Sequence, residues 1–167
     1  MNLPNVLIIL FIAYLIVVMF IYFYQRKLLY HPSENNYLDE TNLNHKIEKI
    51  YVQSDTKLIS WYYNNNKSYK TILFFHGNAG RLDNRVYKLN ELAKLNINYL
   101  IVAYRGFSGN QGKPSEVGIY KDSDAAKKWL NENGVDDKNI ILYGESLGTA
   151  VAVDLASKNN FAGIILE

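Results

Sequence analysis

The segment G-E-S-L-G at residues 144–148 carries the clearest chemical signal in this 167-residue chain. It follows an apolar run and precedes a helical pattern, so it is predicted to turn sharply from a strand into a helix. Such a turn lifts the Ser146 side chain clear of the sheet, and a Cβ at either glycine would crowd it. The N–H of Leu147 can then donate to an oxyanion. We therefore predict that Ser146 is a nucleophile; the alternative is an ordinary glycine turn with a capping serine.

A second segment, F-F-H-G-N-A-G at residues 74–80, ends a predicted parallel strand. Ligands of open α/β sheets bind at the carboxyl ends of the strands, so we expect His76 and Gly77 at the same edge as Ser146. The backbone N–H of Asn78 is predicted to be the second oxyanion donor. We interpret His76 as a structural residue that bridges loops, in preference to a general base.

Two further groups of residues could be mistaken for binding sites. The Gly-rich stretch 104–114 lacks the P-loop pattern, because Lys113 is followed by Pro114 and Phe107 stands where the first glycine should be. We interpret it as a loop that borders the cleft. Four acidic residues on or next to a predicted helix are expected to be solvated charges, and no metal site is predicted: Asp122, Asp124, Asp136 and Asp137.

The elements that must position these segments alternate along the chain. Residues 47–53 and 57–63 predict a hairpin. The later strands are predicted at 71–75, 99–103, 140–143 and 163–166, and the helices at 83–95, after the capping Ser115, and at 147–158. This alternation of apolar strands and helices predicts an α/β fold with a mainly parallel sheet and helices on both faces.

The N-terminal residues 1–25 carry no charge, and residues 6–23 are all apolar or aromatic. As a helix this run would cover about 27 Å, close to the hydrocarbon core of a bilayer. A basic n-region and a small-residue cleavage site are absent from the sequence, which favours an uncleaved anchor over a signal peptide. We predict a single-pass anchor at 1–25 with the lipid bilayer as its partner, a juxtamembrane linker at 26–44 and the main domain at 45–167. Lys and Arg are enriched on the cytoplasmic side of membrane spans, so Arg26 and Lys27 favour a cytoplasmic main domain.

Composition excludes several other classes of protein. The formal net charge of +2 gives no electrostatic footprint for nucleic acid. The absence of cysteine excludes a disulfide framework, a thiolate zinc site and a cysteine nucleophile. A hydrophobic share of 49% is enough to build a packed core.

Taken as a set, four segments resemble the α/β-hydrolases, and most closely a membrane-anchored, serine-aminopeptidase-like branch: residues 73–80, 104–109, 112–116 and 144–148. The resemblance covers nearly the whole chain as the N-terminal part of that fold. It implies Ser146 as nucleophile, with the Asn78 and Leu147 backbones as the oxyanion hole. It also implies hydrolysis of an ester, thioester or amide of a small acyl or peptide substrate, without metal or cofactor.

The triad of this fold follows the chain order serine, acid, histidine. After Ser146 the sequence holds only Asp154 and Glu167 as acids and no histidine, and Asp154 lies within a predicted helix. Three explanations are open: a fragment of a longer hydrolase, a natural short inactive protein, or a second polypeptide that supplies the missing strands and the histidine. We expect the first. The alternative function is a catalytically inactive, membrane-tethered binding module.

Overall fold

The computed structural model describes residues 2–33 and 42–167. It divides into two compact units, Met1–His31 and Pro32–Glu167, each of which is described by itself. Residues 34–41 of the predicted linker, and Met1 of the predicted anchor, lie outside the described residues.

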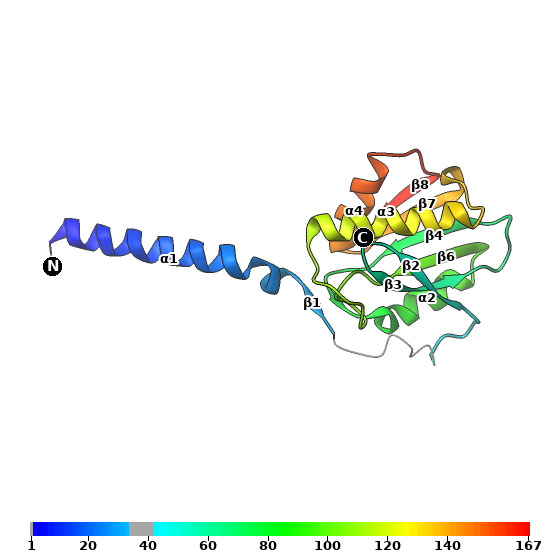
Figure 1. The fold of residues 1–167 in the computed structure, drawn as a ribbon, viewed down its shortest axis with the longest axis horizontal. Coiled ribbons are helices and arrows are strands. Elements are labelled where there is room, and N and C mark those ends of the chain that lie inside the picture. The colour runs from blue at the N-terminus through cyan, green and yellow to red at the C-terminus, as the bar shows by residue number, and fades with distance from the viewer. Residues whose placement is uncertain (1, 34–41) are drawn as a thin grey trace. The chain divides into compact units, whose positions relative to one another are not determined.

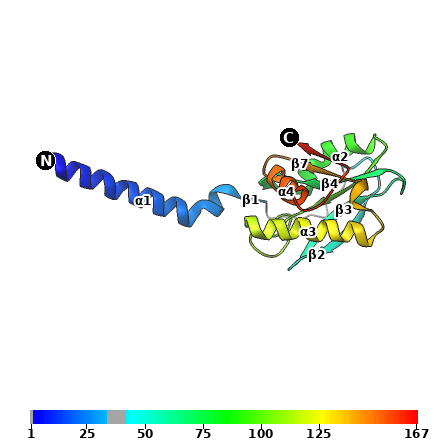
Figure 2. The same cartoon turned by 90° about the horizontal axis from the view of Figure 1, so that it is seen from above.

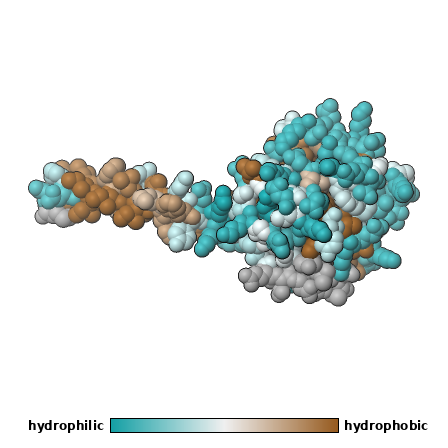
Figure 3. All heavy atoms as spheres, viewed as in Figure 1, coloured by the Kyte–Doolittle hydropathy of each residue, from teal (hydrophilic) through white to brown (hydrophobic). Residues whose placement is uncertain are grey.

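The first unit is the single helix α1 (Leu3–Leu29), whose 27 residues include no buried one. Its length of about 40 Å and its apolar composition are sufficient for a membrane span. Figure 3 shows the hydrophobic surface that covers most of the helix. The helix continues four residues past Gln25, so that Arg26 and Lys27 form part of its last turn, where cations complement the helix dipole.

The second unit contains a six-stranded sheet with the order β2-β3-β6-β4-β7-β8 (Figure 1). β2 (Glu48–Gln53), β3 and β6 pair antiparallel, whereas the pairs β6-β4, β4-β7 and β7-β8 are parallel. The remaining strands of this sheet are β3 (Lys57–Tyr63), β4 (Lys70–Phe75), β6 (Ile97–Val102), β7 (Ile140–Gly144) and β8 (Gly163–Leu166). The predicted α/β class and the predicted hairpin are confirmed.

Helices cover both faces of the sheet, as Figure 2 shows. α3 (Glu116–Glu132) packs against α4 (Leu147–Ala156), while α2 (Val86–Ala93) lies over a separate core on the other face. Phe74 and Ile101 belong to that core, and the residues that alternate with them along β4 and β6 are also buried. Both faces of these strands are therefore covered, which explains their continuous apolar sequences.

The short elements and the ends of the helices differ slightly from the sequence prediction. The predicted helix 83–95 begins as the 3-10 helix η1 (Leu82–Arg85), and the predicted helix 147–158 ends at Ala156. Ser115 caps α3 as predicted, because its Oγ accepts from the Gly118 N–H at 3.2 Å. The other short elements are β1 (His31–Pro32), β5 (Ala79–Gly80) and η2 (Asp137–Asn139).

Candidate active site

Ser146 lies on the turn between β7 and α4 and is exposed. Its backbone has φ +51° and ψ −113°, a conformation that residues with a side chain seldom adopt. Neighbouring backbone holds the turn in place: the Glu145 N–H donates to the Phe75 carbonyl at 2.9 Å, and the Ser146 N–H donates to the Glu167 carbonyl at 2.7 Å. The turn is therefore fixed to the strand ends on both sides of it.

The two glycines of the motif allow α4 to approach the sheet closely. A Cβ on Gly148 would lie 2.1 Å from the Phe75 carbonyl oxygen, and one on Gly144 would lie 2.5 Å from the Gly148 oxygen. Neither obstacle is a flexible side chain, so a larger residue would push the helix away from β4. This is the crowding that the sequence pattern indicated.

The loop after β4 runs directly beside Ser146. A Cβ built on Gly77 would be 3.5 Å from the Ser146 Cβ, which places the backbone of this loop next to the turn. Asn78 follows Gly77 in the same loop and is half-buried. Leu147 is the first residue of α4, and an amide at that position has no partner within its own helix. The structure thus brings the predicted segments 74–80 and 144–148 together at one edge of the sheet.

His76 is buried and both of its ring nitrogens are engaged. Nδ1 donates to the Gly77 carbonyl at 2.7 Å, and Nε2 accepts from the Tyr104 backbone N–H at 3.4 Å. The ring also packs against Tyr104 and Phe107. Burial and the nearby positive charge of Arg85 lower the pKa of His76 to about 3, so the imidazole is neutral at pH 7. These contacts support the structural interpretation of this histidine.

A charged cluster that the sequence analysis missed lies beside the turn. Glu145 accepts from Arg85 at 2.8 Å and from Lys88 at 3.1 Å, and Lys88 also donates to Glu167 at 2.7 Å. Burial raises the pKa of Glu145, but the two cations outweigh it and hold the pKa below its usual value. A pocket of about 570 Å³ opens here, lined by Ala79, Gly80, Asn84, Arg85, Tyr87, Lys88, Glu145 and Glu167.

A second ionic cluster joins Asp122 to Arg105 and corrects the expectation for one aspartate. Asp122 is fully buried, whereas we expected a solvated charge. Its carboxylate accepts from the backbone N–H, Nε and Nη2 of Arg105 at 2.7–3.1 Å. The signal was present in the sequence, since Asp122 is three residues after Ile119 and four before Ala126 on the apolar face of α3.

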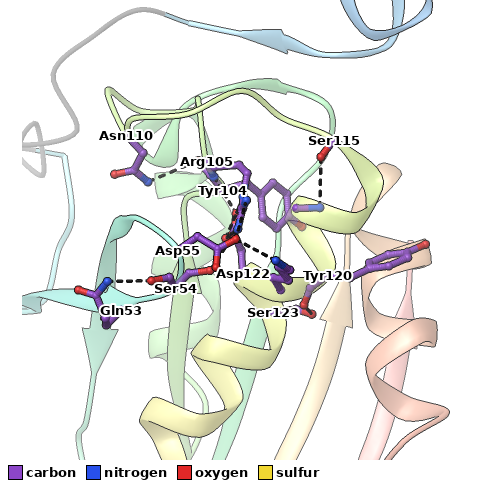
Figure 4. Close-up of polar contacts among 12 residues, drawn as sticks. Gln53, Ser54, Asp55, Tyr104, Arg105, Asn110, Ser115, Tyr120, Asp122 and Ser123 are labelled. Atoms are coloured by element: carbon purple, nitrogen blue, oxygen red, sulfur yellow. Dashed lines mark hydrogen bonds and ion pairs between the residues drawn. The ribbon is translucent and has the colours of Figure 1, made fainter.

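Arg105 also reaches the hairpin turn between β2 and β3 (Figure 4). It donates to Ser54 at 3.2 Å and to Asp55 at 3.3 Å, so one guanidinium joins the hairpin turn, the loop after β6 and α3. Of the other three aspartates, Asp124 and Asp136 are exposed and Asp137 pairs with Lys127. Within residues 2–33 and 42–167, no three histidine, aspartate or glutamate side chains gather as metal ligands.

The loop 104–114 supports the loop that contains Asn78. The Tyr104 hydroxyl donates to the His76 carbonyl at 3.2 Å, and the Leu82 N–H donates to Ser108 Oγ at 3.1 Å. Ser108 itself is buried with φ +51°. The segment that we predicted as a cleft border therefore packs against the backbone that follows β4.

The sheet, the strand-turn-helix at Ser146 and the adjoining loop are those of the α/β-hydrolase fold. A family model described as "Alpha/beta hydrolase of unknown function (DUF1057)" matches residues 40–167, and the chain belongs to this family. The predicted resemblance to α/β-hydrolases is thereby confirmed.

Several known proteins are similar to the chain over most of its length. It is 36% identical over 156 residues to an uncharacterized protein of Mycobacterium tuberculosis, covering 90% of this chain and 56% of that protein. It is 34% identical over 167 residues to protein bem46 of Schizosaccharomyces pombe, covering 92% of this chain and 56% of that protein. The Pyrococcus furiosus esterase Pf2001 superimposes with a TM-score of 0.61 at 25% identity, covering 75% of this chain and 51% of the esterase. The chain thus spans about half the length of the curated relatives it matches.

Proposed function

We propose that the protein to which this chain belongs is a membrane-anchored serine hydrolase that acts on an ester, thioester or amide through an acyl-serine intermediate. Ser146 is the nucleophile, and the N–H groups of Asn78 and Leu147 form the oxyanion hole. The observation that carries this proposal is the exposed Ser146, in a strained backbone conformation, directly beside the Gly77 backbone. Strain of this kind persists where surrounding structure enforces it, and it is concentrated at functional sites.

The reaction needs a base to take the proton of the Ser146 hydroxyl. His76 cannot serve, because its nitrogens are engaged and its pKa is about 3. All three histidines of the sequence precede Ser146, whereas in this fold the base follows the nucleophile. We propose that the acid and the histidine come from outside these 167 residues, either from further sequence of the same protein or from a second polypeptide. The attack of Ser146 then gives a tetrahedral oxyanion, which collapses to the acyl-serine and expels the alcohol, thiol or amine with the proton that the histidine took from Ser146. Water then attacks the acyl-serine and releases the carboxylic acid and the free Ser146 hydroxyl.

The substrate class and the membrane anchor rest on separate observations. The similar Pyrococcus furiosus protein is an esterase, which favours an ester over an amide. The apolar α1, with Arg26 and Lys27 in its last turn, supports anchoring in the lipid bilayer with the second unit on the cytoplasmic side. Protection of the second unit from protease added outside intact cells tests this sidedness.

A fluorophosphonate probe tests the nucleophile. The protein, expressed from its complete gene and solubilised in detergent, should be labelled, and Ser146→Ala should abolish the labelling. Ser157→Ala, which removes a hydroxyl at the other end of α4, is the matched control and should keep it. No labelling of the wild type at any pH would refute the proposal. That result would favour the alternative, a catalytically inactive membrane-tethered binding module.

A further inference from the structure

We propose that Arg85 is a positioning residue that holds the loop bearing Asn78 in register with the turn bearing Ser146. This inference rests on the proposed function, because the loop supplies one of the two oxyanion donors. Arg85 touches no reacting atom in this scheme. It acts through the backbone on one side and through Glu145 on the other.

The Arg85 side chain joins the two halves of the site by direct hydrogen bonds. It is nearly buried, with a side-chain exposure of 10%. Nη1 donates to the Ala79 carbonyl at 2.8 Å and to the Arg81 carbonyl at 3.3 Å, while Nη2 donates to Glu145 Oε1 at 2.8 Å. One rigid guanidinium therefore bonds to the residue after Asn78 and to the residue before Ser146.

The pair closes over Gly77, which lies between the two halves. A Cβ on Gly77 would lie 3.2 Å from Glu145 Oε1 and 3.4 Å from Arg85 Nη2, so the ion pair is in close contact with the loop backbone. Lys88 holds the second oxygen of Glu145 at 3.1 Å. With both oxygens bound, the carboxylate has a fixed direction, and the loop cannot slide along the turn without breaking the Arg85 bonds.

This arrangement matters for rate more than for substrate binding. An oxyanion donor is effective only near 2.7–3.1 Å from the developing charge, and a displacement of about 1 Å can cost about 100-fold in rate. The negative charge develops only as the bound substrate reacts and is absent from the bound substrate itself, so a displaced donor lowers kcat and leaves KM nearly unchanged. We expect Arg85→Gln to lower kcat about 10- to 100-fold.

The experiment measures kcat and KM for a p-nitrophenyl ester, using the protein from its complete gene in detergent. The variants are Arg85→Gln, Arg85→Lys, Glu145→Gln and the double variant Arg85→Gln/Glu145→Gln. Arg85→Lys should recover part of the lost kcat, because an ammonium keeps the positive charge beside Glu145. The recovery should be partial, because an ammonium lacks the planar guanidinium that bonds to Glu145 and to the loop carbonyls at once. The kcat of the double variant should be no lower than that of the slower single variant, since both substitutions break the same Arg85–Glu145 ion pair. Arg81→Gln is the matched control, because it removes a guanidinium from the same loop, but one that pairs with Asp83 and not with Glu145. Its kcat should stay within about twofold of the wild-type value.

The outcomes separate this inference from the proposed function. If the wild type is active and Ser146→Ala is not, but kcat of Arg85→Gln stays within about threefold of wild type, the positioning role is wrong and the hydrolase remains. A raised KM at constant kcat would also overturn the inference, since it would make Arg85 a substrate-binding residue. Should Arg85→Gln fail to fold, Glu145→Gln decides, because it keeps the size of the side chain and the Arg85 bonds to the loop carbonyls. An inactive wild type would refute both proposals.

Discussion

Because the backbone at Ser146 is strained, we expect glycine to stabilise the protein more than alanine at this position, the reverse of the usual order. At φ +51° and ψ −113°, a residue with a Cβ is strained by about 1–3 kcal/mol. Glycine removes that strain but costs about 0.5–1 kcal/mol in backbone entropy. Ser146→Gly should therefore be more stable than Ser146→Ala by about 1 kcal/mol, and by about 2.5 kcal/mol at most. Because both variants lack the hydroxyl, their difference contains the strain of the Cβ and the entropy cost of glycine, but no effect of the lost hydroxyl.

Thermal unfolding of the detergent-solubilised protein measures this difference. For a domain of this size, 1 kcal/mol corresponds to about 2–4 °C, so the Tm of Ser146→Gly should exceed that of Ser146→Ala by about 2–4 °C. Ala150→Gly, at an exposed position of α4, is the control. Glycine is less stable than alanine at an ordinary helix position, so this variant should lose about 1 kcal/mol of unfolding free energy. A Ser146→Gly variant that melts at or below the Tm of Ser146→Ala would refute the assignment of strain to this turn.

Three further predictions concern the groups around the turn. The pKa of His76 is about 3 in the folded protein and near 6.5 in the unfolded chain. The unfolded chain therefore binds a proton more readily, and the free energy of unfolding declines as the pH falls from about 6.5 toward 3. The loss should reach about 2 kcal/mol at pH 5. His76→Gln should flatten this decline in Tm between pH 7 and pH 5, and an unchanged slope would contradict the burial of a neutral ring. Asp122→Asn should destabilise by about 3 kcal/mol in urea unfolding, because it leaves the mostly buried Arg105 without its carboxylate; a loss below about 1 kcal/mol would show that the pair is solvated. Gly148→Ala should lose about 3 kcal/mol in the same assay through its clash with the backbone of β4, whereas Gly163→Ala, with open space around it, should stay within about 1 kcal/mol; equal losses would argue against the close approach.

The local sequence was sufficient for the elements and for the meeting of the two main segments. Apolar runs and helical spacing identified β4 and α4, and the rule that parallel strands share a carboxyl edge brought Gly77 to Ser146. The tight turn at Ser146 was predicted from the G-x-S-x-G pattern, because a Cβ at either glycine would crowd it, whereas the strained φ of Ser146 itself is seen only in the structure.

The ionic contacts could not be obtained in this way. Arg85 and Glu145 are 60 residues apart, so their pairing depends on how η1 and α2 dock on the sheet, which periodicity does not specify. Asp122 illustrates a different failure, since its residue type suggested solvent although its helical position indicated the core. A buried carboxylate is tolerated there because Arg105 supplies several donors to it.

A crystal structure of the protein with a phosphonate bound to Ser146 would test the nucleophile and the oxyanion hole together, because the phosphonyl oxygen stands in for the oxyanion. We expect a covalent bond from Ser146 Oγ to phosphorus, with the phosphonyl oxygen about 2.7–3.1 Å from the backbone nitrogens of both Asn78 and Leu147. A phosphonyl oxygen that points into solvent, or a phosphonate bound to any other residue, would contradict it.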